Sequence, residues 1–403
     1  MRVETQRKID RLAGIWICRL LSLFPVKTPP KRFRPSRILV ILLSEMGSLV
    51  LAKPMFDSIK MKYPWSSVYV LCFEKNREFL ETIGVLPDGN ILTIRADSLS
   101  LLFIDTLRVF RRMRREKLDT VLDCELFSRI SSVYSFLSGA DVRAGFHPHT
   151  QEGLYRGTHF NRPVLYNPYH HISHQFINLV EAIESDGVPK VKRSMPPDDW
   201  EIPVIHIAER TKRTFWDRFQ KDYPLVATRK LVLLYPSGGL LPIRAWPLQN
   251  YCRVAEGLLR EGYAVAVIGM KSDHELAKGI ESNCRNENCL NLTGYTRSVI
   301  ELMILFHYAT LLITNDGGPA HFASVTPIHS ITLYGPESPS LYGTLGKRSI
   351  NLHIPFSCSP CLTAYNHRHS PCDGDNRCLK SISPELVLDK AFFLLGRQEK
   401  TTS

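Results

Sequence analysis

The sequence is poor in cysteine and has no apolar run long enough to cross a bilayer, and each shortage excludes a class of protein. Ten cysteines in 403 residues are far too few for a disulfide scaffold. Charged residues at 22% and hydrophobic residues at 44% exclude a disordered or collagen-like chain. The chain is therefore globular and long enough for two domains. We expect six scattered cysteines to be buried thiols: Cys18, Cys72, Cys124, Cys252, Cys284 and Cys289.

Acidic residues are scarce relative to basic ones. Lysine and arginine number 51 against 39 aspartates and glutamates, which gives a net charge of +12. Residues 1–37 hold ten basic and two acidic side chains, and residues 108–117 hold six and one. A surplus gathered in two segments indicates an anionic partner. A nucleic acid ranks last among such partners, because the sequence has no recognised nucleic-acid-binding module.

Both basic segments overlap stretches with the composition of an amphipathic helix. Residues 9–24 are apolar on average, but Arg11 and Arg19 interrupt them, so the stretch is too short and too charged to span a membrane. A helix lying in a membrane interface fits the pattern, and a helix packed on the protein's own surface fits it equally well. Residues 99–117 predict a second helix, whose basic end is either a solvated face or a contact with an anionic leaflet.

Strand and helix signals alternate along the chain. The apolar run 38–43, before a glycine-containing loop, predicts a parallel strand buried on both faces, and a helix is expected at 49–62. Further strands are expected at 68–73, 118–123, 230–235, 263–268, 290–293, 311–314 and 330–334. Such alternation predicts an α/β protein with two Rossmann-like, doubly wound domains, whose strand ends face each other across a ligand-binding cleft.

Proline and polar residues gather at 187–203, where we expect a linker between the two domains. We therefore divide the chain into a basic amphipathic N-terminal segment, 1–36, a first domain, 37–200, and a second domain, 201–390.

The segment 316–321, Asp-Gly-Gly-Pro-Ala-His, follows an expected strand and precedes a helix expected at 321–325. Two glycines let the backbone approach a ligand closely, and exposed N–H groups at a helix start favour phosphate oxygens. Asp316 is suited to capping the loop or holding a sugar hydroxyl, and His321 to donating to a phosphate. This chemistry predicts a diphosphate site, with a plain strand-to-helix turn as the alternative.

The same segment resembles a motif of a known family. Residues 315–324, Asn-Asp-Gly-Gly-Pro-Ala-His-Phe-Ala-Ser, are similar to the D-S-G-P-x-H-x-A segment of glycosyltransferase family 9, the heptosyltransferase-like enzymes of bacterial surface polysaccharide assembly. Supporting segments occur in the family's order at 37–54, 236–247, 292–296 and 333–337. The resemblance covers roughly residues 37–390 and is most specific near His321.

The resemblance implies a GT-B architecture and an inverting transfer of a sugar from a nucleotide-diphosphate donor, commonly ADP-heptose. The acceptor would be a lipopolysaccharide core or another cell-surface glycan, and catalysis would require no metal ion. Arg244, where the family usually has lysine, would neutralise charge on the departing nucleotide. Donor contacts are expected from eight residues: Ser237, Gly238, Arg244, Thr296, Asp316, Gly317, Gly318 and His321.

One departure from the family affects the expected catalytic base. The family's first loop reads M-G-D, and its aspartate deprotonates the acceptor hydroxyl, whereas this chain has Ser48 at that position. A serine cannot take the proton at neutral pH without a partner. Glu45, three residues earlier, is the carboxylate that could substitute, and a solvated or helix-capping carboxylate is the alternative. If neither residue acts, the chain would be a catalytically inactive nucleotide-sugar-binding or scaffold protein.

A cysteine-rich loop occupies residues 358–378. Cys358 and Cys361 form a C-x2-C pair, and Cys372 and Cys378 follow. Four thiolates could hold a structural zinc ion, with free thiols as the alternative and disulfides disfavoured in the cytosol. We expect a cytoplasmic protein that attaches peripherally to the inner face of the bacterial inner membrane.

Overall fold

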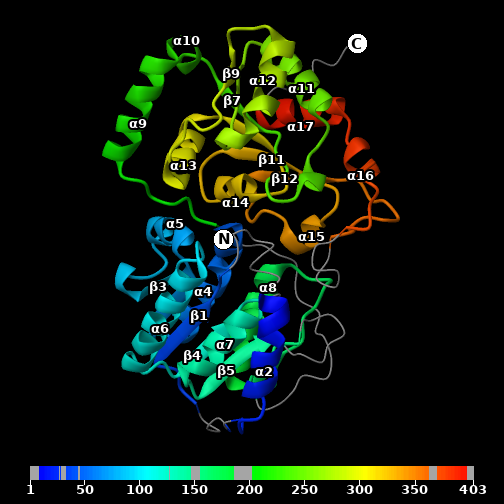
Figure 1. Ribbon diagram of the computed structural model, residues 1–403. Helices are drawn as coiled ribbons and strands as arrows, with labels where there is room; N and C mark the ends of the chain where they lie inside the picture. Colours follow the sequence, from blue (N-terminus) through cyan, green and yellow to red (C-terminus); the bar gives the residue numbers. More distant parts are fainter. Residues whose placement is uncertain are drawn as a thin grey trace. The chain divides into compact units, whose positions relative to one another are not determined.

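The computed structural model describes residues 9–26, 28, 33–43, 46–126, 128–146, 155–185, 202–362 and 370–396. The chain divides into two compact units, one built mostly from Met1–Pro197 and the other from Asp198–Thr363 with His369–Ser403. Each unit consists of a parallel sheet flanked by helices (Figure 1). Most of the expected linker at 187–203 lies outside the described residues.

The first unit is organised around a six-stranded parallel sheet with the order β3-β2-β1-β4-β5-β6. Apolar residues fill the central strands because helices cover both faces of a parallel sheet. The register pairs Ile41 of β1 with Leu71 of β2 and with Asp123 of β4. The strands are β1 (Arg37–Ile41), β2 (Ser67–Phe73), β3 (Ile91–Ile94), β4 (Thr120–Asp123), β5 (Val142–Phe146) and β6 (Arg162–Val164).

Local signals fix the helices of this unit. Ser98 and Ser128 cap two helix starts by accepting hydrogen bonds from backbone N–H groups three residues later, and Gly139, at φ 74°, ends the second of these helices. The helices are α2 (Ile15–Leu21), α3 (Met46–Leu51), α4 (Lys53–Lys62), α5 (Arg77–Ile83), α6 (Leu99–Arg115), α7 (Arg129–Ser138) and α8 (Ile172–Glu181), with a π-helical turn, η1 (Asp10–Gly14), before α2.

Two helix predictions needed adjustment. The helix expected at 49–62 begins earlier, at Met46, and is divided at Ala52 into α3 and α4. Pro54 explains the division, because a proline has no N–H to donate and is tolerated only in the first turn of a helix. The basic helix expected at 99–117 is confirmed as α6. It ends two residues earlier than expected, at Arg115, and Lys117 just beyond it takes a positive φ of 49°.

The second unit repeats this plan with the sheet order β12-β11-β10-β7-β8-β9, all neighbours parallel. Its core includes the wholly buried Val232, Leu234, Ile313 and Leu333, on three adjacent strands. The strands are β7 (Leu231–Tyr235), β8 (Ala264–Val267), β9 (Cys289–Asn291), β10 (Leu311–Asn315), β11 (His329–Tyr334) and β12 (Ser349–His353).

The helices of the second unit include one that corrects a sequence expectation. The helix expected at 321–325 starts at Gly318, because Pro319 fits the first turn, so His321 lies in the middle of the helix rather than at its start. The α-helices are α9 (Glu209–Asp222), α10 (Pro224–Ala227), α11 (Leu248–Arg260), α12 (His274–Cys284), α13 (Val299–Tyr308), α14 (Gly318–Ser324), α15 (Pro339–Tyr342), α16 (Arg377–Lys380) and α17 (Pro384–Leu394).

Two further expectations can be compared with this fold. Five of the six scattered cysteines are buried free thiols, as predicted, and Cys284 is half-buried. Within the described ranges, no helix has both the length and the apolar character needed to cross a bilayer.

Candidate functional site

Polar residues gather where three neighbouring strands of the second unit end. In the sheet, β10 lies between β7 and β11, and Thr314 is in register with Tyr235 on one side and Thr332 on the other. The chain then places Ser237 after β7, Asp316 after β10 and Glu337 after β11. Ligands of parallel α/β sheets bind beyond these carboxyl ends.

A buried ion-pair cluster occupies this edge. The Arg244 guanidinium places Nη2 2.7 Å from Oε1 of Glu337 and Nε 3.4 Å from Oδ2 of Asp316. All three side chains are at least nine-tenths buried. One positive and two negative charges in a poorly solvated place hold one another in position, because an unpaired charge there is costly. Burial holds the pKa of the neighbouring Tyr334 hydroxyl well above its usual range; the charges of Asp316 and Glu337 raise it further, and the charge of Arg244 lowers it.

The turn that carries Arg244 is held by close packing. Gly238 approaches the chain so closely that an added Cβ would lie 2.7 Å from the carbonyl oxygen of Leu241. A short 3₁₀ turn, Pro242–Arg244, follows. Next comes Trp246, whose indole N–H donates to the carbonyl of Ile382 at 3.0 Å. A glycine at 238 and a buried tryptophan at 246 therefore fix where the guanidinium lies.

Asn315, the last residue of β10, links this turn to the strand ends. Its wholly buried side-chain amide donates to the carbonyls of Pro236 at 2.9 Å and Ser237 at 3.2 Å. Its oxygen accepts from the backbone N–H of Trp246 and from the Tyr251 hydroxyl, each at 3.1 Å. One amide thereby satisfies four groups from the loop after β7 and from the start of α11.

The two glycines after Asp316 leave open space. A Cβ added at Gly317 would meet nothing nearer than 4.0 Å, and Gly317 has the extended φ of 170° that any residue can adopt. At Gly318 the nearest atom would be a ring carbon of Phe322 at 3.4 Å, an ordinary contact. Because the protein's own packing does not require glycine at either position, the space above the loop is available to a ligand.

The remaining predicted donor residues are placed differently. His321 is buried in α14, where its carbonyl accepts from the Ser324 hydroxyl at 2.7 Å. Thr296 is half-buried in the turn after β9, and β7 and β8 lie between β9 and β10 in the sheet. Thr296 is therefore set apart from the cluster around Arg244. Sequence reasoning missed Glu337 as a partner of Arg244, although the matching segment 333–337 contained it.

The first unit has its own polar group beyond the ends of β1 and β4. Ser48 is half-buried in the first turn of α3, and Glu45 lies outside the described residues. Asp123, which ends the neighbouring strand β4, is wholly buried, and Arg156 Nη2 donates to its Oδ2. Burial raises the pKa of the Asp123 carboxyl to about 6, against the lowering effect of Arg156, and the charge of Glu125 raises it further. Sequence reasoning missed Asp123 and Glu125, although an acidic strand end beside β1 could have indicated them.

The four clustered cysteines lie apart from one another in their local contacts, and the zinc site stays a prediction. Within the described residues, which include all four, no group of three or more His, Cys, Asp or Glu side chains could hold a metal ion. Cys358 is exposed, whereas Cys378 is buried in α16. Cys361 accepts a hydrogen bond from Ser370, and the Cys372 thiol lies 3.7 Å from the Asp373 carboxylate. In this structure the thiols of Cys361 and Cys372 have different local partners, and Cys378 packs within α16.

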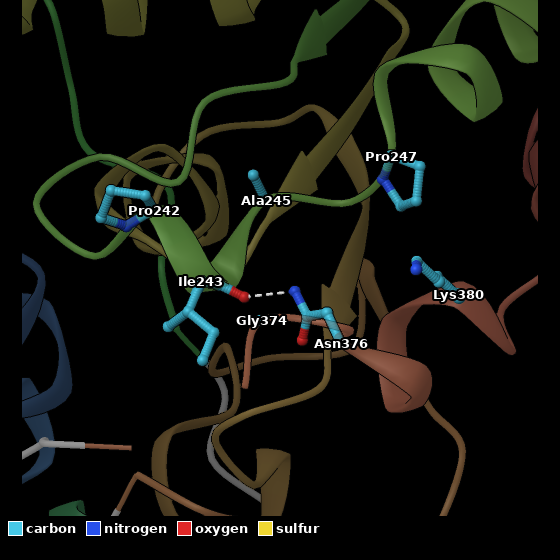
Figure 2. A pocket seen from close by; sticks show the side chains of 7 residues that line it. All are labelled: Pro242, Ile243, Ala245, Pro247, Gly374, Asn376 and Lys380. Atoms are coloured by element: carbon cyan, nitrogen blue, oxygen red, sulfur yellow. Dashed lines mark hydrogen bonds between the residues drawn. The ribbon is translucent and has the colours of Figure 1, made fainter. Parts of the chain in front are cut away.

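A cavity of about 520 Å³ lies between the Arg244 turn and the cysteine-rich loop (Figure 2). Asn376 closes one side of it by donating from Nδ2 to the carbonyl of Ile243 at 2.6 Å. None of the predicted donor residues lines this cavity, whose walls are Pro242, Ile243, Ala245, Pro247, Gly374, Asn376 and Lys380.

Comparison with known proteins assigns the family. The family model described as glycosyltransferase family 9 (heptosyltransferase) matches residues 106–370. The chain belongs to glycosyltransferase family 9. The resemblance seen in the sequence is thereby confirmed, and this family 9 chain is a glycosyltransferase.

Full-length relatives and solved structures agree with this assignment. Lipopolysaccharide heptosyltransferase 2 of Salmonella typhimurium is 23% identical over 368 residues, which cover 90% of this chain and 99% of the relative. The protein of the same name from Escherichia coli K12 is 24% identical over 369 residues, with the same coverage. The structure of E. coli ADP-heptose lps heptosyltransferase II aligns with a TM-score of 0.69 at 21% identity, covering 89% of this chain and 98% of that one.

A second solved structure also matches along most of the chain. The glycosyl transferase family 9 protein from Veillonella parvula aligns with a TM-score of 0.71 at 22% identity, covering 91% of this chain and 99% of that chain. These two structural matches, together with the two six-stranded parallel sheets, confirm the predicted GT-B architecture of this family 9 glycosyltransferase.

Proposed function

We propose that this glycosyltransferase moves a heptose from ADP-heptose to the core of a lipopolysaccharide. The observation that carries the proposal is the polar edge of the second unit, where Arg244 lies among buried carboxylates and the glycines after Asp316 leave room for a ligand. The sugar and the acceptor are inferred from relatives. Two relatives that align over 90% of this chain are named lipopolysaccharide heptosyltransferase 2.

The donor diphosphate is proposed to lie over Gly317 and Gly318. A backbone without side chains lets phosphate oxygens approach N–H groups closely, and neither glycine is required by the packing beneath. Arg244, fixed by its ion pairs, would offset the negative charge that builds up on the departing nucleotide. Ser237, Gly238 and Asp316 would shape the wall of this donor site, with His321 and Thr296 as further contacts.

Transfer is proposed to invert the configuration at the sugar. An acceptor hydroxyl attacks the anomeric carbon, the bond from that carbon to the diphosphate oxygen breaks, and the nucleotide diphosphate leaves with the bonding electrons. A base must remove the hydroxyl proton, and we propose Glu45 for this role, with Ser48 three residues later in the sequence. No metal ion is proposed in catalysis, so the rate should be unchanged by EDTA.

The activity is proposed to take place at the inner face of the bacterial inner membrane, where a lipid-linked acceptor would be anchored. The direct test is to incubate the purified protein with ADP-heptose and heptose-deficient lipopolysaccharide core, and to follow ADP release and the mass of the product. Release of ADP without acceptor modification, or no thermal stabilisation by ADP-heptose, would contradict the proposal.

Replacing Glu45 by Gln tests the base. Loss of transfer by about 10²–10⁴-fold, with donor binding intact in a thermal shift experiment, would support the role of Glu45. Undiminished transfer would assign the base to another residue, and loss of donor binding would assign Glu45 to the donor site instead. The Ser48→Ala variant is the matched control on the same segment, and it should lose much less activity.

A further inference from the structure

The N-terminal helix carries an exposed apolar stripe. Leu12, Trp16 and Leu20, spaced four residues apart, are 70%, 66% and 60% exposed. Leu23 and Phe24 extend the stripe beyond the helix end at 80% and 54% exposure. Residues four apart lie on one side of a helix, so a single face of η1 and α2 presents Leu12, Trp16 and Leu20 to solvent.

The opposite side of the same helix is docked on the first unit. Gly14 and Cys18 are buried, and Gly14 lies so close to α7 that an added Cβ would be 2.9 Å from Cβ of Arg129. Asp10 accepts from the backbone N–H groups of Arg129 at 2.8 Å and Ile130 at 3.1 Å. The helix is therefore an integral part of the first unit.

A second helix of the same unit has a similar outer face. On α6, Leu99, Phe103 and Leu107 are 58%, 65% and 39% exposed, and Ile104 beside them is 50% exposed. The opposite side of α6 buries Asp105, Val109 and Met113 in the unit. Both α2 and α6 pack against α7 (Figure 1), so one helix connects the two apolar faces.

The exposed charges on the two helices themselves are of one sign, although Glu116, directly after α6, lies 3.3 Å from Nη2 of Arg115. Each helix contains a single acidic residue, and in both cases it is turned inward: Asp10 bonds to α7, and the buried Asp105 pairs with Arg95 at 2.8 Å. The charged side chains left on the outer faces are arginines, and Arg19 lies 5.2 Å from the ring centroid of Trp16. The exposed arginines on these helices are Arg11, Arg19, Arg108, Arg111, Arg114 and Arg115.

We infer that the outer faces of α2 and α6 form a docking surface for an anionic lipid bilayer. Exposed tryptophan, phenylalanine and leucine side chains enter the interface between head groups and acyl chains, and arginines at the border bind lipid phosphates. A protein partner of mixed charge would be expected to meet carboxylates as well as arginines, and neither helix offers a carboxylate on its outer face. The inference deepens the proposed function and rests on it only in that a lipid-linked acceptor requires the enzyme at a membrane.

The apolar contribution is tested by sedimentation with vesicles of phosphatidylcholine containing 30% phosphatidylglycerol. The double variant Leu20→Asp/Phe103→Asp places one carboxylate on each face and should lower the partition coefficient at least tenfold. Two matched controls place the same charge at equally exposed positions elsewhere: Met61→Asp on α4 of the same unit, at 81% exposure, and Phe393→Asp on α17 of the other unit, at 71%. Both controls should bind vesicles like the unchanged protein.

The electrostatic contribution is tested with Arg111→Gln/Arg115→Gln. Each arginine near an anionic leaflet contributes about 1 kcal/mol, so the pair should lower partitioning about 20–30-fold on these vesicles, and hardly at all on pure phosphatidylcholine. Raising the salt concentration should weaken binding of the unchanged protein and leave that of the double glutamine variant less affected.

Three results would overturn the inference. These are binding that survives both double variants, binding that the two control variants lose equally, and a concentration-dependent dimer that the Leu20→Asp/Phe103→Asp variant abolishes in the absence of lipid. Thermal stabilisation by ADP-heptose and transfer to a detergent-dispersed acceptor are measured on the same variants. Retained transfer with lost vesicle binding supports the surface, whereas absent transfer in every variant would contradict the proposed function and leave the vesicle result valid.

Discussion

Nη2 of Arg244 lies 2.7 Å from Oε1 of Glu337, and both side chains are more than nine-tenths buried. Removing one partner of a buried pair leaves an uncompensated charge, which costs about 3–5 kcal/mol. We therefore expect Arg244→Gln and Glu337→Gln each to lower the free energy of unfolding by about 3 kcal/mol. The double variant should lose clearly less than the sum, because it removes both charges. Urea denaturation of all four proteins measures this coupling, and additive losses would show that the pair is not coupled.

The Gly317→Ala variant should weaken donor binding without lowering the stability of the fold. Alanine at this position meets no atom within 4.0 Å and needs no unusual φ, so the melting temperature should change by no more than about 1 °C. Its methyl group would occupy the space assigned to the donor diphosphate, so the Kd for ADP should rise at least tenfold.

The Gly238→Ala variant is the opposite control. Its Cβ would overlap the Leu241 carbonyl at 2.7 Å, and it should lose about 1–3 kcal/mol of stability. Calorimetry with and without ADP distinguishes the two variants. An unchanged ADP affinity in Gly317→Ala would move the diphosphate away from this loop.

The buried His159 predicts a pH dependence of stability. Burial and the positive charge of Arg143 lower the pKa of its imidazole from 6.5 to about 4. Between these values the unfolded chain binds a proton that the folded chain does not, so stability is fully present above pH 6.5 and is lost as the pH falls toward 4. The full shift corresponds to about 3 kcal/mol.

Asp123 acts in the opposite direction over the same range, because burial raises its pKa from 3.8 to about 6 and its contribution is lost as the pH rises. The measurement is therefore the difference between the unchanged protein and His159→Gln in urea unfolding at pH 7 and pH 4.5. This difference should shrink by about 2–3 kcal/mol at the lower pH. A constant difference would mean that His159 titrates normally in the folded state.

Asn315 provides a fourth prediction. Replacing it by Asp keeps the shape of the side chain and the oxygen that accepts from the backbone N–H of Trp246. It removes both donations to the carbonyls of Pro236 and Ser237, and it buries a charge. We expect a loss of about 2–5 kcal/mol at pH 7, decreasing at low pH as the carboxyl group is protonated. Chemical denaturation at pH 7 and pH 4 measures this, and an equal loss at both pH values would argue against a buried charge.

The strands and the two-domain plan could be predicted because buried parallel strands are continuous apolar runs, as at 38–43 and 311–314. The strands β3, β6 and β12 were missed because they are short or only partly buried, so their pattern differs little from that of loops. The buried strand β5 was also missed, because Arg143 and Gly145 interrupt its apolar run. The helix start at Gly318 was placed too late because the glycine pair was given more weight than Pro319.

The candidate site could be predicted only where its residues form a local sequence motif. The segment after β10 has a motif of its own, so Asp316 and both glycines could be found from sequence. The pairing of Arg244 with Glu337 joins residues 93 positions apart in sequence, on the loops after two strands that are not neighbours, and no spacing rule reveals it. The cysteine spacing records positions along the chain and not the directions in which thiols point, so the zinc site stays a prediction.

The close approach of Gly14 to Arg129 has a consequence for how the enzyme would meet a membrane. A flexible tether would keep the protein near the lipid while leaving it free to rotate. Here the helix is held on its unit by the hydrogen bonds of Asp10 to α7 and by the contact of Phe24 with Phe136. The helix and the unit would therefore move as one rigid body. Attachment then also sets an orientation, so the strand ends of the first unit are presented to the bilayer at one fixed angle.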